Sequence, residues 1–285
     1  MSRKLVSFDW AMKKILRQKA NFGILEGFLS ELFKFDVEIQ EILESEANQE
    51  TKDDKFNRVD LLAKNENGEL ILIEVQYNDE IDYFQRILYG ASKLITEYIS
   101  KGKGYTKVKK VYSVNIVYFE IGQGDDYVYY GKTEFIGLHN NDKLIPSEDQ
   151  QERFNINSIS EIYPQYYILR VNQFNDIAKN SLDEWIYFLK NEEIKTDFRA
   201  KGLDEAKEVL RVLKLDETER AKYERREENR RYKESLFYTA EIRGEKRGER
   251  NKAIEIAKIS LEQNIDISTI ALITGLSVEE IERLR

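Results

Sequence analysis

The chain has 285 residues, which is enough for one full-sized domain with an appendage or for two small domains. Hydrophobic residues make up 41% of it and charged residues 34%, with a mean hydropathy of -0.61, so a mainly disordered chain is excluded. The absence of cysteine, the single His139 and the net charge of -8 exclude disulfides, thiolate or histidine-rich metal sites, and a protein that coats nucleic acid.

A helical segment followed by three strands is predicted for the first 77 residues. Apolar residues from Phe8 to Phe35 have nearly helical spacing, which indicates one or two helices. Val37 to Leu43 alternates like a strand. The β-favouring runs Arg58 to Lys64 and Glu69 to Tyr77 flank the turn residues Asn65 to Gly68, so we predict a hairpin there.

The middle of the chain continues this alternation of helix and strand. Glu80 to Ser100 has a helical pattern, and the apolar runs Val111 to Phe119, Tyr127 to Leu138 and Tyr166 to Val171 are predicted strands. Strands flanked by helices indicate a mixed α/β domain, to which we assign residues 1–198.

Helical patterns dominate after residue 180. Leu182 to Leu189 and Glu205 to Leu215 are predicted helices, and residues 199–250 form a charge-dense helical linker or arm. The net charge is -9 for residues 1–198, +3 for residues 199–250 and -2 for the remainder. The basic surplus therefore lies in the arm, which is either a solvated helix or a contact surface for DNA.

Residues 251–285 are predicted as a small helical module. The last helix begins at Ser277, with Glu280 at the capping-box position. The acids of this helix would face phosphate if it were the recognition helix of a helix-turn-helix, so we favour docking or oligomerisation. The apolar face for this contact is supplied by six residues: Ile256, Ile259, Leu272, Ile273, Ile281 and Leu284.

Two acids in apolar strands carry the predicted chemistry. Asp60 lies between Val59 and Leu61, and Glu74 between Ile73 and Val75. A three-residue loop at positions 66–68 pairs residues whose numbers sum to 134, which places Asp60 opposite Glu74, with Cβ atoms about 5 Å apart. Two such carboxylates repel each other unless a proton or a cation lies between them. The sequence therefore predicts a site for Mg²⁺ or Mn²⁺, the ions that oxygen ligands prefer.

At these residues the chain resembles the PD-(D/E)XK nucleases, and more narrowly the bacterial recombination-promoting nuclease or transposase family. The hairpin with Asp60 and Ile73-Glu74-Val75-Gln76 carries the superfamily motif. Three further patches are similar to the narrower family: residues 8–15, residues 84–89 and the C-terminal stretch 256–281. The resemblance implies a restriction-endonuclease-like fold with a helical C-terminal extension.

The resemblance also implies roles for residues of the hairpin. Asp60 and Glu74 would be metal ligands, with the Val75 carbonyl as a third. Gln76 stands where the superfamily has lysine. Glutamine can orient a water or a phosphate but supplies no positive charge. The missing charge would come from Lys13, Lys55 or Arg86.

Among these three residues we prefer Arg86 as the phosphate partner, because a guanidinium binds phosphate in a fixed geometry. It lies three residues before Tyr89 on one helical face. Glu31, or else Glu26, could add a further acid from the first helix.

Plainer interpretations stand beside these assignments. Asp60 and Glu74 could be exposed strand acids or partners of Arg58 and Lys64, and Gln76 could be an ordinary strand amide. Arg86 could serve helix packing, the lysines could be surface residues, and His139 is expected to be structural or exposed.

The sequence therefore predicts a magnesium-dependent DNA endonuclease, linked by its family resemblance to recombination, mobile elements or phage defence. We expect it in the cytoplasm without membrane contact, because no apolar run of about 18 residues and no secretion signal occur. A homodimer or higher homo-oligomer through the C-terminal helices would supply two cutting sites. The alternatives are a nuclease-fold DNA-binding or regulatory protein that lost activity at Gln76, and a partner-binding scaffold.

Overall fold

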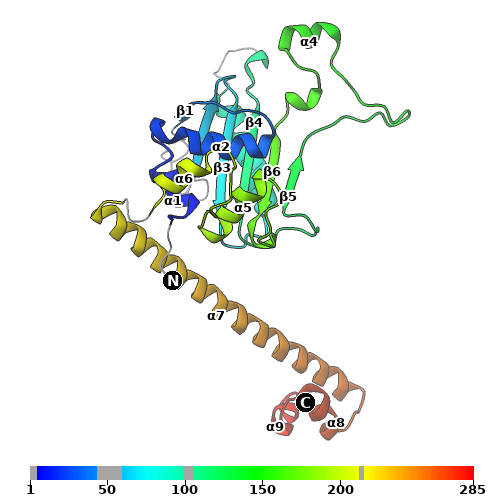
Figure 1. Ribbon diagram of the computed structural model, residues 1–285. Coiled ribbons are helices and arrows are strands. Elements are labelled where there is room, and N and C mark those ends of the chain that lie inside the picture. The colour runs from blue at the N-terminus through cyan, green and yellow to red at the C-terminus, as the bar shows by residue number, and fades with distance from the viewer. Residues whose placement is uncertain (1–4, 44–59, 99–104, 212–214) are drawn as a thin grey trace. The chain divides into compact units, whose positions relative to one another are not determined.

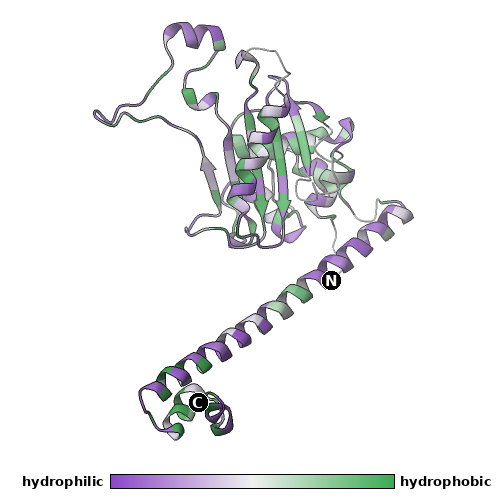
Figure 2. Cartoon of the chain, turned by 180° about the vertical axis from the view of Figure 1, so that it is seen from behind, coloured by the Kyte–Doolittle hydropathy of each residue, from purple (hydrophilic) through white to green (hydrophobic). Residues whose placement is uncertain are grey.

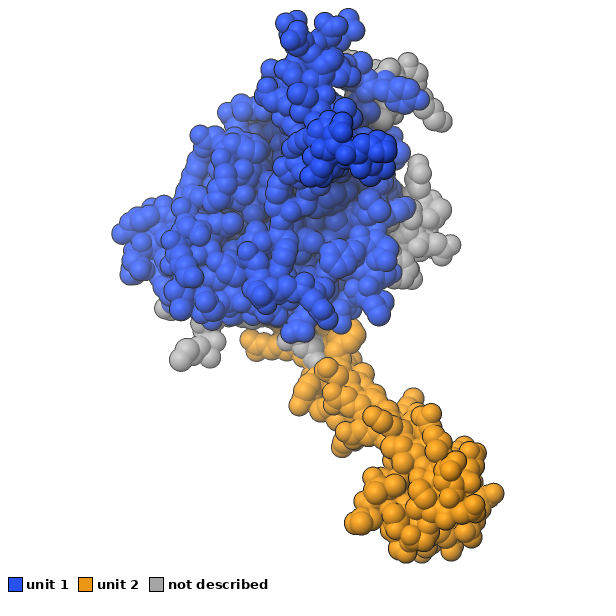
Figure 3. Space-filling model, turned by 90° about the vertical axis from the view of Figure 1, so that its right-hand side faces the viewer, with its two compact units in different colours: residues 1–216 blue, residues 217–285 orange. Residues whose placement is uncertain are grey.

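The computed structural model describes residues 5–43, 60–98, 105–211 and 215–285. The chain divides into two compact units, Met1–Asp216 and Glu217–Arg285, which are coloured separately in Figure 3. Every helix within the described residues is too short or too polar to cross a lipid bilayer.

A six-stranded mixed sheet forms the centre of the first unit (Figure 1). The spatial order is β1-β2-β3-β4-β6-β5; β4 is parallel to β3 and to β6, and the other neighbours are antiparallel. This sheet with its flanking helices confirms the predicted restriction-endonuclease-like α/β fold. The strands are β1 Ile39–Leu43, β2 Leu61–Asn65, β3 Leu70–Gln76, β4 Val111–Val117, β5 Val128–Gly131 and β6 Gln165–Arg170.

The two middle strands are apolar because helices cover both of their faces. All seven residues of β4 are buried, as are the first six of β3. These strands are largely green in the hydropathy view of Figure 2. Burial on both faces is typical of strands in parallel pairing. Polar residues in β3 and β4 are therefore exceptions that require a physical reason.

Helix α3 (Tyr83–Tyr98) connects β3 to β4 and covers one face of the sheet. Its residues Ala91 and Leu94 pack against Leu70 and Leu72 of β3. Since side chains alternate between faces along a strand, Glu74 lies on the same face as Leu72. Glu74 therefore points toward the layer that contains α3.

Helices α2 (Phe22–Phe33) and α5 (Ser181–Asn191) cover the opposite face (Figure 1). Phe28 of α2 and Trp185 of α5 have ring centroids 5.5 Å apart, and both rings contact Phe8 of α1 (Phe8–Lys14). Phe33 stacks on Tyr112 of β4 with ring centroids 4.7 Å apart. This aromatic core holds the N-terminal helices against the sheet.

The predicted strand Tyr127 to Leu138 is wrong beyond Gly131. β5 pairs with β6 only from Val128, opposite Leu169, to Gly131, opposite Tyr166. β6 itself begins at Gln165, directly after Pro164. Beyond this point the chain has no continuing partner strand in β6. The remaining elements of this unit are α4 Glu148–Phe154, α6 Leu203–Val209 and the 3-10 helices Lys19–Asn21, Tyr105–Lys107, Ile159–Glu161 and Val171–Gln173.

The second unit consists of α7 (Glu217–Glu262), α8 (Ile267–Thr274) and α9 (Val278–Glu282). α7 runs across residue 250, where the sequence suggested the end of the arm. The predicted capping box is confirmed, because Ser277 Oγ accepts a hydrogen bond from Glu280 N and Glu280 Oε2 accepts one from Ser277 N.

The six apolar residues predicted for the docking face divide into two groups. Ile281 is fully buried in a cluster with Ala257 and Ile270, and Leu284 packs against this cluster. The other four are exposed: Ile256, Ile259, Leu272 and Ile273. Two of the six thus serve the internal core of this unit.

Candidate active site

The β2–β3 hairpin brings the two predicted acids to the same end of the sheet. Leu61 pairs with Ile73 and Lys64 with Leu70, so residue numbers sum to 134 as predicted. Asn65 N donates to Glu69 O, which closes the three-residue loop, and Gly68 adopts a φ of 72° that favours glycine. The register is confirmed, and Asp60 directly precedes the first paired residue of β2.

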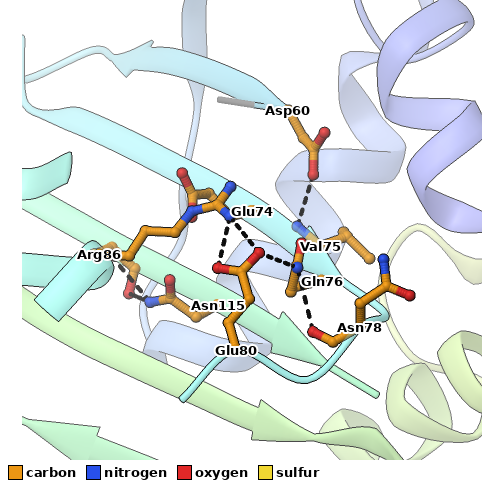
Figure 4. A network of polar contacts seen from close by, with 9 residues as sticks. Asp60, Glu74, Val75, Gln76, Asn78, Glu80, Arg86 and Asn115 are labelled. Carbon is orange, nitrogen blue, oxygen red and sulfur yellow. Dashed lines mark hydrogen bonds and ion pairs between the residues drawn. The ribbon is translucent and has the colours of Figure 1, made fainter. Parts of the chain in front are cut away.

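Asp60 caps the exposed backbone of β3. Its Oδ2 accepts a hydrogen bond of 2.8 Å from Val75 N (Figure 4). The N–H and C=O of one strand residue point to the same side. The Val75 carbonyl therefore points toward the side on which Asp60 lies. Arg17 Nη2 holds the Asp60 main chain by a 3.0 Å bond to its carbonyl oxygen.

Glu74 is an acid in an apolar environment. Its side chain is only 9% exposed, and burial raises its pKa to about 7. The Arg86 guanidinium opposes this shift, with Nε 3.8 Å from Glu74 Oε2, whereas the negative charges of Asp60 and Glu80 add to it.

Gln76 and Arg86 are joined by Glu80, a residue of the loop before α3. Gln76 Nε2 donates to Glu80 Oε1 at 2.6 Å and to the Asn78 carbonyl at 3.2 Å. Arg86 Nη1 donates to both carboxylate oxygens of Glu80 at 2.9 Å. Figure 4 shows these side chains converging beside Glu74. The structure thus places three of the predicted residues, Glu74, Gln76 and Arg86, in one network.

Sequence reasoning missed Glu80 and two buried neighbours of Glu74. Asn115 of β4 is the Cα partner of Glu74 in the parallel ladder and is 1% exposed. Its Nδ2 donates to Ser113 Oγ and to the Tyr167 carbonyl. An amide within an apolar strand was the available signal, the same one that singled out Glu74. Tyr83 is buried, and both burial and the charge of Glu74 raise the pKa of its phenol.

The remaining candidate residues are not brought to this network within the described part of the chain. Lys55 lies outside the described residues, and so does the side chain of Lys13. Tyr89 is 52% exposed. Glu26 Oε1 accepts a 2.7 Å hydrogen bond from Ile39 N, which gives this acid a structural role at the start of β1.

The donor set at Asp60 and Glu74 suits a hard divalent cation, but it is small. Within the described residues, no three acidic or histidine side chains gather closely enough to hold a metal by themselves. The two carboxylates and the backbone carbonyl are all oxygen ligands, the kind that magnesium prefers. Magnesium commonly completes its coordination shell with water and substrate phosphate. A buried carboxylate such as Glu74, whose ionised form is disfavoured by burial, is consistent with such an ion.

Comparison with known protein families gives a match over most of the chain. Residues 6–240 match the family described as PD-(D/E)XK nuclease family transposase. The match includes the hairpin, α3 and about the first half of α7. No match was found among curated proteins or among solved structures.

Proposed function

Because the chain belongs to the PD-(D/E)XK nuclease family transposases, we propose that it is a divalent-metal-dependent endonuclease that hydrolyses phosphodiester bonds of DNA. The observation that carries this proposal is the Glu74 carboxylate, which the hairpin register sets against Asp60; burial raises its pKa to about 7, and the negative charge of Asp60 adds to this shift. Burying a carboxylate is costly unless a cation compensates for it. A cation bound at this position would remove the cost and supply the chemistry.

In this proposal Asp60, Glu74 and the Val75 carbonyl would hold a magnesium or manganese ion. When bound, such an ion would neutralise charge on the scissile phosphate and lower the pKa of the attacking water. Gln76 orients the water. Arg86 contacts a phosphate oxygen, and its position on α3 brings the guanidinium Nε within 3.8 Å of Glu74 Oε2.

The test is cleavage of supercoiled plasmid by the purified chain with Mg²⁺ and, separately, with EDTA. We expect nicked and linear product only with the metal, and loss of at least about a hundredfold in rate in Asp60→Asn and Glu74→Gln. Glu152→Gln is the matched control. Glu152 is an exposed acid of α4, so this substitution removes one negative charge far from the predicted ligands in the sequence. Undiminished cleavage by Asp60→Asn would contradict the assignment.

A second candidate function is a nuclease-fold protein that binds DNA without cutting it. It is favoured by the neutral Gln76 at the lysine position and by the pairing of Arg86 with Glu80. Salt-sensitive DNA binding that needs no metal, without cleavage under Mg²⁺ or Mn²⁺, would support this alternative.

The organisation into residues 1–198, 199–250 and 251–285 and assembly as a homodimer or higher homo-oligomer are further proposals. Four exposed apolar residues of the second unit support assembly: Ile256, Ile259, Leu272 and Ile273. Deletion after Arg250 removes the whole core of Ala257, Ile270 and Ile281. This deletion should abolish assembly and leave cleavage intact. A role in recombination, mobile elements or phage defence, in the cytoplasm, fits the family.

A further inference from the structure

The Gln76 side-chain amide is fixed in one of its two orientations. Its Nε2 lies 2.6 Å from Glu80 Oε1 and 3.2 Å from the Asn78 carbonyl oxygen. Both neighbours accept hydrogen bonds and neither can donate one, because a carboxylate and a carbonyl carry no hydrogen. The NH₂ group must therefore face them, and a flipped amide would set oxygen against oxygen. The atom of Gln76 that remains for other contacts is Oε1.

Glu80 is itself held in place by a cation. Both of its carboxylate oxygens accept from Arg86 Nη1 at 2.9 Å, and the two side chains are 30% and 23% exposed. A charge-assisted contact of this kind is stronger than a neutral hydrogen bond. The Arg86 contact thus immobilises the carboxylate that orients Gln76.

We propose that Glu80 is a positioning residue that makes Gln76 a hydrogen-bond acceptor in the active site and sets the direction of the Arg86 guanidinium. The inference rests on the proposed nuclease function. It assigns Gln76 a role different from that of the superfamily lysine, which brings a positive charge. Gln76 Oε1 would accept a hydrogen bond from the attacking water or supply an oxygen ligand to the cation, and as an acceptor it cannot donate to a phosphate.

The same arrangement divides the donors of Arg86. Nη1 is occupied by Glu80, and Nε faces Glu74 at 3.8 Å. Among the described residues no hydrogen bond engages Nη2 of Arg86, so this nitrogen is the donor available to a substrate phosphate. With Glu80 removed, the guanidinium and the Gln76 amide would both lose the partner that orients them.

The first test observes the Gln76 amide directly in the full-length, metal-free chain. ¹⁵N labelling of glutamine side chains gives an NH₂ signal for Gln76, assigned by its loss in Gln76→Met. We expect slow hydrogen exchange of this NH₂ in the wild type and faster exchange, by roughly tenfold or more, in Glu80→Ala. Glu152→Ala, which removes an exposed acid of α4, should leave the signal unchanged. An identical exchange rate in Glu80→Ala overturns the inference.

The second test separates positioning from folding. In Mg²⁺-dependent cleavage, Glu80→Ala should lower kcat by roughly tenfold to a hundredfold, because a misplaced catalytic group costs about this much. The melting temperature should stay close to that of Glu152→Ala. Glu80→Gln should lose less kcat than Glu80→Ala, because one amide oxygen can still accept from both Gln76 and Arg86, as Glu80 Oε1 does, while the charge that strengthens the contact with Arg86 is lost.

The two tests distinguish failure of the inference from failure of the proposed function. A wild-type chain that cleaves DNA, together with a Glu80→Ala variant of unchanged kcat, refutes the positioning role and leaves the nuclease intact. A wild-type chain that cuts no DNA with Mg²⁺ or Mn²⁺ refutes the proposed function and with it the catalytic part of the inference. The exchange measurement still decides in that case whether Glu80 fixes the Gln76 amide.

Discussion

Replacing Glu74 by glutamine should stabilise the metal-free protein in a pH-dependent way. Burial raises the pKa of Glu74 from its ordinary value of 4.5 to about 7. One pKa unit corresponds to about 1.4 kcal/mol, so the ionised side chain destabilises the folded state by about 3 kcal/mol. The side chain is only 9% exposed, so solvent screens this cost weakly.

The direction of the pH dependence follows from the raised pKa. Below pH 4.5, the pKa of Glu74 in the unfolded chain, the folded and unfolded chains both carry the proton on Glu74, and its burial causes no pH-dependent loss of stability. Between pH 4.5 and about 7 the unfolded chain has lost this proton while the folded chain still binds it, so the stability of the folded state falls over this range and reaches its full loss above about pH 7. Glu74→Gln abolishes this loss. Its advantage over the wild type should be about 3 kcal/mol at alkaline pH and below about 1 kcal/mol near pH 5.

Urea unfolding of both proteins in EDTA, followed by tryptophan fluorescence between pH 5 and pH 8.5, measures this difference. In thermal unfolding the same effect should raise Tm by about 6 to 12 °C at the alkaline end, as for a domain of about 200 residues. Glu152→Gln provides the control for general loss of negative charge. A difference that is the same at both ends of the pH range, or a destabilised Glu74→Gln, would refute the reasoning.

Three further changes test other parts of the structure. Arg86→Gln removes the cation that lowers the pKa of Glu74, so the pH-dependent stability loss should continue above about pH 7; a loss that still ends near pH 7 in the same urea titration would speak against this pairing. Gly27→Ala should destabilise the first unit by about 3 kcal/mol or prevent folding, because the added Cβ would lie 2.2 Å from the Lys201 carbonyl oxygen; a wild-type denaturation midpoint would contradict the close approach. Ser277→Ala removes the cap of α9 and should cost about 1 kcal/mol, seen as faster amide hydrogen exchange in residues 278–285 and not elsewhere.

The hairpin shows how much of the site the sequence could predict. Local signals fix its geometry: loop length, a glycine at a position of positive φ and alternation of apolar residues. These signals act over about 17 residues and need no tertiary information. The register that sets Asp60 against Glu74 therefore follows from the amino-acid sequence alone.

The residues that sequence reasoning missed depend on longer-range geometry. Glu80 reaches Gln76 and Arg86 only because the loop between β3 and α3 turns back over the end of the strand. Asn115 meets Glu74 through parallel pairing of two strands that are separated by a helix. The spacing of such residues in the sequence does not predict which residues of the two strands pair, because a crossover connection has no fixed length.

The length of β5 illustrates the same limit in the fold. Tyr127 to Leu138 contains enough β-favouring residues to predict a long strand, yet pairing ends at Gly131. A strand extends only as far as its neighbour offers backbone groups, and β6 begins at Gln165. Propensity could predict a strand at this point of the chain, whereas the partner determines where the strand ends.

The central claim is that Asp60 and Glu74 together hold one divalent cation. Titration of the full-length, metal-free chain with Mn²⁺, with free ion followed by electron paramagnetic resonance, tests it most directly. We expect one Mn²⁺ site per chain at neutral pH, competed by Mg²⁺, lost in Asp60→Asn and in Glu74→Gln and retained in Glu152→Gln. Binding of the same affinity and stoichiometry in Asp60→Asn and Glu74→Gln would contradict it.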